Sequence, residues 1–213
     1  MFTGIVTSTF PLTHLTRTEE AARFALPLDA THRTDLKVGA SVALDGVCMT
    51  VAQLDDHGVW FDASHETLRR TTLGVRAAGD RVNVERSARQ GDEVGGHPMS
   101  GHVDGRAEIV VVDRTPANTR LRFRVPADLR RYVFNKGFVG LNGCSLTVVD
   151  LDRAAGEFDV WLIPETLRLT TFGEQKVGDA VNLEIDRQTQ ITVDTVYEAV
   201  RAALEDHLPD ALG

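Results

Sequence analysis

Hydrophobic and polar side chains alternate with a period of two along much of this chain. Residues 120–125 (RLRFRV) alternate arginines with apolar side chains, and residues 181–185 (VNLEI) repeat the same spacing. This period predicts β-strands that bury one face and place the other, including the arginines, in water. Short strands separated by turns within a segment of about 100 residues predict a small closed barrel.

Turn and helix signals divide these strands. Asp45-Gly46 and Asn142-Gly143 lie between β-rich runs, and both dipeptides readily adopt positive φ, so each predicts a hairpin turn. Short helical segments are expected near residues 66–72 and 127–133, where they would cap the ends of the barrel.

The chain repeats itself. Residues 65–74 (HETLRRTTLG) return as residues 164–173 (PETLRLTTFG), with seven of ten positions identical. Four further blocks recur in the same order at offsets of 97 to 99 residues, among them residues 3–6 with 100–103 and residues 44–51 with 141–148. Recurrence of five ordered blocks indicates duplication of one unit, with small loop insertions and deletions between the copies.

The duplication predicts a division into two barrels and a tail. We place the first barrel at residues 1–97, the second at 98–190, and an unduplicated helix with its tail at 191–213. Capping-type residues at Thr192, Asp194 and Thr195 are expected to begin this helix. Its apolar face comprises Val193, Val196, Tyr197, Val200, Ala203 and Leu204. This face either covers a barrel of the same chain or, as we favour, packs against other subunits of a homo-oligomer.

Composition narrows the class of protein. The 213 residues are 42% hydrophobic and 25% charged, which excludes wholesale disorder. The net charge of −8 does not fit the basic surface of a nucleic-acid binder. Cys48 and Cys144 can form one disulfide at most. No apolar run is long enough to span a membrane, and the N-terminus lacks the pattern of a secretory signal, so a cytoplasmic protein is expected.

Candidate reactive side chains lie where the repeat breaks its own symmetry. Cys48 in the first copy is matched by Ser145, and His102 in the second copy is matched by Ile5. A thiol and an imidazole can serve nucleophilic and acid–base chemistry, although each is also a common structural residue. Residues 95–102 (GGHPMSGH) have neither the spacing of a zinc site nor the context of a phosphate-binding loop.

Four separated motifs then point to one family. Residues 1–6 (MFTGIV), 95–105 (GGHPMSGHVDG), 143–148 (GCSLTV) and 163–167 (IPETL) resemble riboflavin synthase, the alpha-chain family. The resemblance covers essentially the whole chain. It implies an all-β fold of two tandem, six-stranded Greek-key barrels of the flavin-reductase-like type plus a C-terminal α-helix, assembled as a homotrimer.

The resemblance also implies an activity. Members of this family convert two molecules of 6,7-dimethyl-8-ribityllumazine to riboflavin and 5-amino-6-ribitylaminouracil by transfer of a four-carbon unit, without a cofactor. Each barrel would offer a pocket for one substrate molecule, and a lumazine synthase becomes a candidate partner. Two like pockets suit a reaction between two copies of one molecule, because holding both in fixed orientation is worth roughly 7–11 kcal/mol.

The family's binding positions transfer to matching residues here. Around the N-terminal pocket they are Gly4, Ile5, Val6, Cys48, Met49, Thr50, Asp62, Ala63, Ser64, His65, Glu66 and Thr67. Around the C-terminal pocket they are Gly101, His102, Val103, Lys136, Ser145, Leu146, Thr147, Ile163, Pro164, Glu165, Thr166, Leu167 and Arg168. Backbone groups would read the pyrimidinedione edge, while polar side chains and Lys136 would contact the ribityl hydroxyls.

Cys48, His102 and Ser41 are the candidate catalytic residues. One lumazine needs a nucleophile or activated water at C7, and the other must lose a proton from its C7 methyl group. Since Cys48 and His102 belong to different copies, the complete site is expected to join barrels of neighbouring subunits. On that view, mixed trimers of Cys48→Ser and His102→Gln chains would recover activity.

Three alternatives compete with this reading. A non-catalytic relative would bind lumazine or flavin as a fluorescent antenna, yet the reactive side chains are present here. A flavin-dependent oxidoreductase would need a nicotinamide-binding unit, and no G-x-G-x-x-G follows a strand. An oligonucleotide-binding barrel is disfavoured by the acidic charge and by an aromatic content of only 6%.

Overall fold

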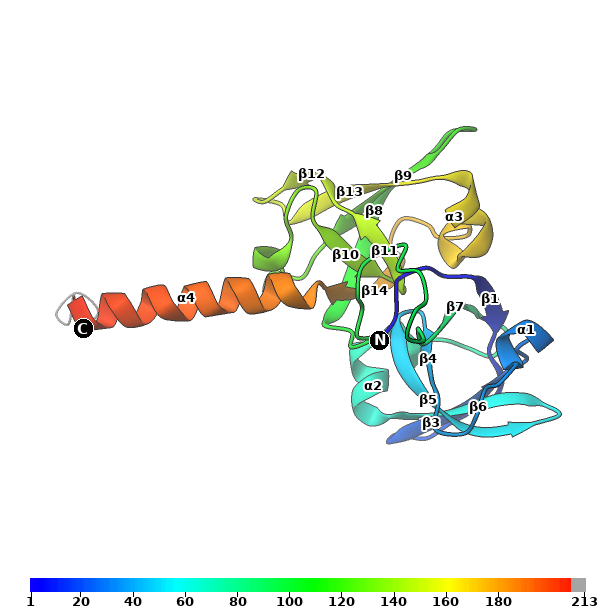
Figure 1. Ribbon diagram of the computed structural model, residues 1–213. Helices are drawn as coiled ribbons and strands as arrows, with labels where there is room; N and C mark the ends of the chain where they lie inside the picture. The colour runs from blue at the N-terminus through cyan, green and yellow to red at the C-terminus, as the bar shows by residue number, and fades with distance from the viewer. Residues whose placement is uncertain (208–213) are drawn as a thin grey trace.

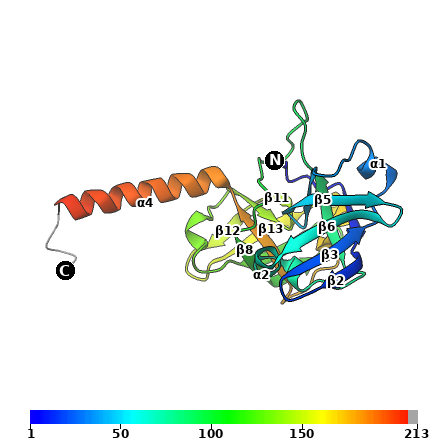
Figure 2. The same ribbon diagram turned by 90° about the horizontal axis from the view of Figure 1, so that it is seen from below.

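The computed structural model describes residues 1–207 as two β-barrels lying side by side, from which one long helix projects (Figure 1, Figure 2). The first barrel contains β1 (Ser8–Pro11), β2 (Thr13–Arg17), β3 (Ala21–Leu26), β4 (Ser41–Leu44), β5 (Val47–Asp55), β6 (Gly58–Ser64) and β7 (Arg81–Arg86). The second contains β8 (Gly105–Arg114), β9 (Thr119–Arg124), β10 (Phe138–Leu141), β11 (Cys144–Thr147), β12 (Val149–Asp152), β13 (Glu157–Leu162) and β14 (Ala180–Ile185). The predicted all-β, duplicated fold is confirmed.

Each sheet has seven strands where six were expected, because one strand in each barrel is divided. The first sheet runs β1-β7-β4-β5-β6-β3-β2 and the second β11-β10-β14-β8-β9-β13-β12. The two end strands are consecutive in the chain and are separated by a single residue, Leu12 or Val148. Each divided strand therefore turns a corner and leaves one sheet edge for the other, which closes the barrel.

The local signals predicted both hairpin turns and one of the two expected helical segments correctly. Asp45-Gly46 and Asn142-Gly143 have positive φ at all four residues and join β4 to β5 and β10 to β11. Helix α2 (His65–Arg70) and its copy α3 (Pro164–Leu169) are followed by the 3₁₀ turns η1 (Thr72–Gly74) and η3 (Thr171–Gly173). The segment 127–133 holds only the 3₁₀ turn η2 (Arg130–Tyr132), and a short helix α1 (Ala30–Arg33) was not foreseen.

The barrel interiors are filled by the predicted apolar faces. Leu121 and Phe123 of β9 and Val181 and Leu183 of β14 are fully buried in the second core. The arginines of β9 are not free in water, however. Arg120 and Arg122 both pair with Asp159 of β13, whose side chain is fully buried beneath them. A buried carboxylate requires such partners, so the outer face of this sheet is an ion-pair network.

The polar positions of β7 and β14 are buried as well, because these strands face the seam between the barrels. Asn83 donates from Nδ2 to the carbonyl of Asn142, and Asn182 donates from Nδ2 to the carbonyl of Asp45, each at 2.8 Å. In return, Asn83 Oδ1 accepts from the backbone N–H of Thr171 in η3. Asn182 Oδ1 likewise accepts from the backbone N–H of Thr72 in η1. These reciprocal bonds fix the relative orientation of the two barrels.

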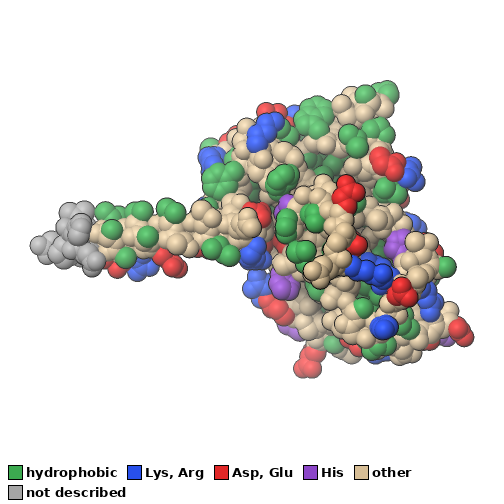
Figure 3. Space-filling model, in the orientation of Figure 1, with side chains coloured by type: hydrophobic (Ala, Val, Ile, Leu, Met, Phe, Trp, Pro, Cys, Tyr) green, Lys and Arg blue, Asp and Glu red, His purple; other side chains and the backbone are tan. Residues whose placement is uncertain are grey.

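The C-terminal helix α4 (Arg187–His207) begins before the predicted position. Asp186 accepts hydrogen bonds from both the backbone N–H and the hydroxyl of Thr189, so it caps the helix, and Thr192, Asp194 and Thr195 lie within the first turns. Val193 packs on the second core, but Val196 and Val200 are 57% and 54% exposed. Figure 3 shows apolar side chains along this projecting helix. Beyond Val193, the apolar face of this helix is therefore not covered by a barrel of the same chain.

No helix within residues 1–207 is long and apolar enough to cross a membrane.

Candidate functional site

The residues expected to carry chemistry in the first barrel lie on the outer face of the β4–β5 hairpin. Ser41 pairs with Thr50, and Ala43 pairs with Cys48, in the antiparallel register. Since side chains alternate along a strand, these residues share one face, whereas Met49 points into the first core. Cys48 is half-buried and its thiol is free.

A segment of the second copy covers this hairpin. The Cys48 backbone N–H donates to the Gly101 carbonyl at 2.8 Å, and Val103 packs against the first core. Gly101 has φ +77, and a Cβ atom there would lie 2.6 Å from the Cys48 Cβ atom, so only glycine permits this approach. The exposed His102 follows directly. We call Ser41, residues 48–50 and residues 101–103 the first half-site.

The second barrel has the equivalent arrangement, in which a segment of the first copy covers the β10–β11 hairpin. The Ser145 backbone N–H donates to the Gly4 carbonyl at 2.9 Å, and Val6 is part of the second core. A Cβ atom on Gly4 would lie 2.5 Å from the Ser145 Cβ atom. We call residues 4–6 and 145–147, with the neighbouring Phe138, the second half-site.

Residues 4–6 and 101–103 are thus exchanged between the barrels, each covering the hairpin of the other copy. This exchanged arrangement differs from two expectations. The segments 4–6 and 101–103 were assigned to the barrel of their own copy, but each lies against the opposite barrel. Cys48 and His102 were expected to share a site through neighbouring subunits, whereas the Cys48–Gly101 hydrogen bond places the backbone directly before His102 against Cys48 of the same chain. The reason is an antiparallel bridge between Phe2 and Met99, from which the two segments depart in opposite directions.

Two buried glutamates hold the exchanged segments. Glu85 of β7 accepts from the backbone and hydroxyl of Thr3 and from the Gly4 N–H, at 2.7 to 3.1 Å. Glu184 of β14 accepts the corresponding three bonds from Ser100 and Gly101, at 2.6 to 3.0 Å. Burial raises the pKa of both carboxyls, and this outweighs the opposite effect of the hydrogen bonds.

The remaining predicted residues lie at the rims of the two barrels, where β6 leads into α2 and β13 leads into α3. Asp62 pairs with Arg23 on the outer face of the first barrel. Ser64 caps α2, and the hydroxyls of Ser64 and Thr67 lie 3.1 Å apart. Ile163 at the start of α3 is the counterpart of Ser64 and is exposed.

Charged side chains of these rims are exposed and largely paired along their own helices. Glu66 pairs with Arg69 and Arg70, and Glu165 with Arg168. These pairs lower the pKa of both glutamates. Lys136 is exposed at φ +67, and its backbone N–H donates to the carbonyl of Val148. The Lys136 side chain is thus available to a ligand at the second barrel.

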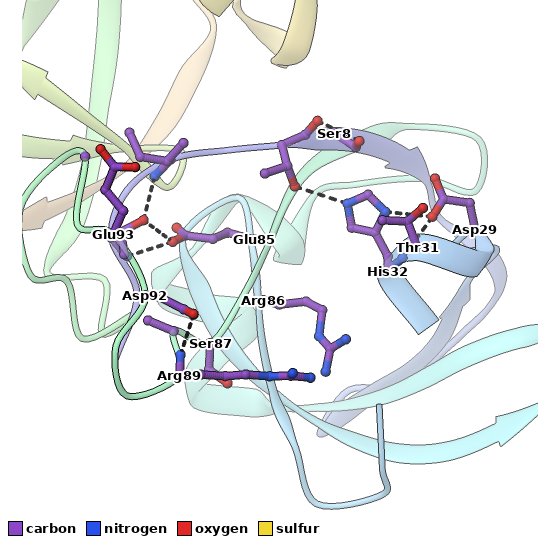
Figure 4. A pocket seen from close by; sticks show the side chains of 15 residues that line it. Ser8, Asp29, Thr31, His32, Glu85, Arg86, Ser87, Arg89, Asp92 and Glu93 are labelled. Carbon is purple, nitrogen blue, oxygen red and sulfur yellow. Dashed lines mark hydrogen bonds and ion pairs between the residues drawn. The ribbon is translucent and has the colours of Figure 1, made fainter. Parts of the chain in front are cut away.

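A cleft of about 960 Å³ lies between β1, α1 and the segment 85–95, and it shares Ile5 with the second half-site. Figure 4 shows the His32 ring beside the Asp29 carboxylate on this cleft. The His32 Nδ1 atom lies 2.8 Å from Asp29 Oδ1, and its Nε2 atom lies 3.1 Å from the Thr7 hydroxyl. Asp29 also caps α1 by accepting the His32 backbone N–H, and this bond lowers its pKa. The cap and the ring contact together anchor α1 to β1.

Within residues 1–207, no three His, Cys, Asp or Glu side chains are grouped to hold a metal ion.

Comparisons with known proteins agree with this duplicated geometry. The family described as "Lumazine binding domain" matches residues 3–87 and again residues 100–186. Riboflavin synthase of Escherichia coli K12 is 44% identical over 207 residues, covering 97% of this chain and 96% of that protein. The chain belongs to the riboflavin synthase family. The Brucella abortus riboflavin synthase is 42% identical over 192 residues, covering 88% of this chain and 94% of its own length.

Solved structures share the fold. The crystal structure of LumP complexed with riboflavin superposes with a TM-score of 0.80, covering 88% of this chain and 100% of that one, at 20% identity. The structure of LumP complexed with 6,7-dimethyl-8-(1'-D-ribityl)lumazine gives a TM-score of 0.79 at 19% identity, with the same coverage.

The two half-sites of this riboflavin synthase family chain differ in polarity. Ser41 and Cys48 in the first are replaced by Phe138 and Ser145 in the second, at matched positions of the hairpin. His102 is likewise replaced by Ile5. The first half-site therefore carries the groups suited to acid–base or nucleophilic chemistry, and the second has a more apolar rim.

Sequence reasoning missed the residues that support the half-sites. Phe2 and Met99 form the small core between the barrels with Ala43. Glu85 and Glu184 end another pair of matched blocks, residues 79–85 (GDRVNVE) and 178–184 (GDAVNLE), where the carboxylate recurs next to apolar strand positions. This recurrence could have indicated that the two glutamates have a structural role, because a solvent-facing position does not require the same carboxylate in both copies.

Replacing Glu184 by Gln is expected to expose Cys48, although the two residues lie in different barrels. Gln cannot accept all three bonds from Ser100 and Gly101, so the segment over Cys48 opens more often. We expect alkylation of Cys48 by iodoacetamide to accelerate about tenfold, which corresponds to roughly 1.4 kcal/mol. Glu85→Gln is the matched control, because it loosens Gly4 over Ser145 and leaves the rate at Cys48 near the wild-type value. Equal rates in the two variants would contradict the exchanged arrangement.

Proposed function

We propose that this chain converts two molecules of 6,7-dimethyl-8-ribityllumazine to riboflavin and 5-amino-6-ribitylaminouracil by four-carbon transfer, the last step of riboflavin biosynthesis. The observation that carries the proposal is the pair of half-sites, each a β-hairpin of one barrel covered by a glycine segment of the other. The identity of 44% to a curated riboflavin synthase over nearly the whole chain supports it.

The polarity difference between the half-sites suits this reaction. Two identical molecules must play different roles, since one loses a proton from its C7 methyl group and the other is attacked at C7. Cys48, His102 and Ser41 surround the first half-site and supply the nucleophilic and acid–base groups. Binding both molecules in fixed orientation supplies much of the remaining rate enhancement, and no cofactor is needed.

Substrate binding follows the same division. Residues 48–50 and 62–67, with 101–103, would contact the first lumazine. Residues 4–6, 145–147 and 163–168, with Lys136, would contact the second. Fixed backbone groups of the hairpins would read the pyrimidinedione edge, and the polar rim would bind the ribityl chains.

The covering segments of the two half-sites leave the antiparallel Phe2–Met99 bridge in opposite directions. This separation supports a homotrimer in which the first half-site of one subunit faces the second half-site of its neighbour. The exposed apolar face of α4 offers the contact that would hold such subunits together. We divide the chain into barrels at residues 1–97 and 98–190, with 191–213 as the assembly segment, of which residues 208–213 lie outside the described part of the chain.

Lysine at Val196 and Val200 is expected to convert the trimer to monomers. Burying the two valines is worth about 2–3 kcal/mol per chain, and charged side chains there would have to be desolvated. Sedimentation velocity at micromolar concentration measures the change. Glu198→Lys is the control, because position 198 lies on the other side of the helix. A trimer that survives both valine substitutions would contradict an assembly role for α4.

We place the protein in the cytoplasm, with lumazine synthase, which makes the substrate, as a candidate partner. The alternative function is a non-catalytic lumazine- or flavin-binding protein. The retention of Ser41, Cys48 and His102 around one half-site favours catalysis over binding alone.

The deciding experiment incubates the purified protein with 6,7-dimethyl-8-ribityllumazine and no additives, and follows riboflavin absorbance. We expect two lumazines consumed for each riboflavin formed. Tight binding of the lumazine without riboflavin formation would favour the antenna-type alternative. Neither binding nor turnover would overturn the proposed function.

A further inference from the structure

His97 is a buried histidine of the segment between the barrels, and it contacts the second half-site. The side chain is only 5% exposed, and Nδ1 lies 2.6 Å from the Ser145 hydroxyl oxygen. The ring stacks on Phe138, with centroids 5.4 Å apart and planes inclined by 16°. A Cβ atom on the preceding Gly96 would lie 2.6 Å from the Ser145 Cβ atom, so glycine there admits the close approach.

Burial lowers the pKa of His97, so the ring carries a single N–H at neutral pH. Among the described residues, Nε2 is buried with no hydrogen-bond partner. If Nδ1 accepted the Ser145 proton, the orphan would be an Nε2–H donor, which costs about 1–3 kcal/mol. If Nδ1–H donates instead, the orphan is a lone pair, which buried structure tolerates better. We therefore assign the proton to Nδ1.

This assignment fixes the direction of the Ser145 hydroxyl. Its oxygen accepts from His97, so its own O–H is free to donate to another group. Ser145 is half-buried, on the hairpin face covered by Gly4. The hydroxyl thus becomes a preoriented donor toward a ligand acceptor. The first half-site has no such stack, because Ser41 and Cys48 occupy the positions of Phe138 and Ser145.

We propose that His97 is a positioning residue that holds the Ser145 hydroxyl as a hydrogen-bond donor to a carbonyl oxygen or ring nitrogen of the heterocycle bound in the second half-site. This inference rests on the proposed function for the identity of the ligand class. It assigns the two half-sites different recognition: a stacked imidazole–serine pair in the second, and a thiol with an exposed imidazole in the first.

Two amide substitutions test the role of the Nδ1 position. Asn places its amide nitrogen where Nδ1 stood and can still donate to Ser145, whereas Gln places its amide at the position of Nε2. With riboflavin as the probe and its fluorescence quenching as the signal, we expect two classes of site per chain. His97→Gln and Ser145→Ala should each weaken one class about tenfold, the double variant should be no weaker, and His97→Asn should bind nearly as the wild type does.

Other outcomes overturn the proposal. Unchanged binding in His97→Gln would show that Ser145 needs no support. Equal weakening of both classes, or a lowered urea midpoint in His97→Gln but not in Ser145→Ala, would indicate a merely structural histidine. The proposed function is read separately from wild-type turnover of lumazine. A wild-type chain that binds riboflavin with this pattern but forms none from lumazine would refute the activity and leave the His97 assignment intact.

Discussion

In the proposed homotrimer, a mixture of Cys48→Ser and His102→Gln chains is expected to recover no riboflavin-forming activity, although each substitution lies in a different copy of the repeat. The Cys48–Gly101 hydrogen bond places both residues in the first half-site of one chain. Every first half-site in the mixture then carries one defect or the other. Activity is measured as the initial rate of riboflavin formation after the two variants are unfolded together and refolded, against each variant refolded alone.

Cys48→Ser mixed with Ser145→Ala is the informative counterpart. The defects now lie in different half-sites, so a complete site forms wherever an intact first half-site meets an intact second half-site from the neighbour. Random mixing of equal amounts would restore about one quarter of the sites in the proposed cyclic trimer. Recovery in the Cys48 and His102 mixture would contradict the exchanged arrangement. No recovery in the Cys48 and Ser145 mixture would contradict a site shared between chains.

The sequence predicted the barrels because their signals are local or repeated. Alternation along residues 120–125 identified the buried faces of strands, and Asp45-Gly46 and Asn142-Gly143 identified the hairpins from residue type alone. Alternation failed where a strand has two buried faces. Alternation along residues 181–185 predicts that Asn182 faces solvent, but Asn182 and its repeat counterpart Asn83 are each bonded to the opposite barrel. Only the packing of the two units against each other makes those positions interior.

The candidate site shows the same limit. Matching motifs located Gly4, Cys48, Gly101 and Ser145, and the structure brings all four to the seam. Which segment covers which hairpin could not be predicted, because the exchange depends on the long-range Phe2–Met99 bridge rather than on any local pattern. The start of α4 was placed too late because its cap, Asp186, directly follows β14 and precedes the capping candidates Thr192, Asp194 and Thr195.

The seam also explains why the half-sites depend on both barrels at once. The turns at Gly46 and Gly143 pack back to back, and each turn leads directly into the strand that carries Cys48 or Ser145. A shift of one barrel against the other therefore moves a covering segment and the hairpin beneath it in opposite directions. Misplacement by about 1 Å at such a site can cost about a hundredfold in rate.

Gly46→Ala is accordingly expected to lower the free energy of unfolding by about 3 kcal/mol or more. It should also reduce riboflavin formation, because both half-sites would be displaced. A Cβ atom there would lie 2.6 Å from the Gly143 nitrogen and 2.9 Å from its Cα atom, and neither backbone atom can move without separating the barrels. Gly79→Ala is the matched control, because Gly79 also has positive φ but no atom within 4 Å of its Cβ position, so only backbone strain of about 1 kcal/mol remains. Urea unfolding of both variants measures the difference. If the two midpoints coincide, the seam has room for a methyl group, and the close apposition of the two turns cannot be what aligns the half-sites.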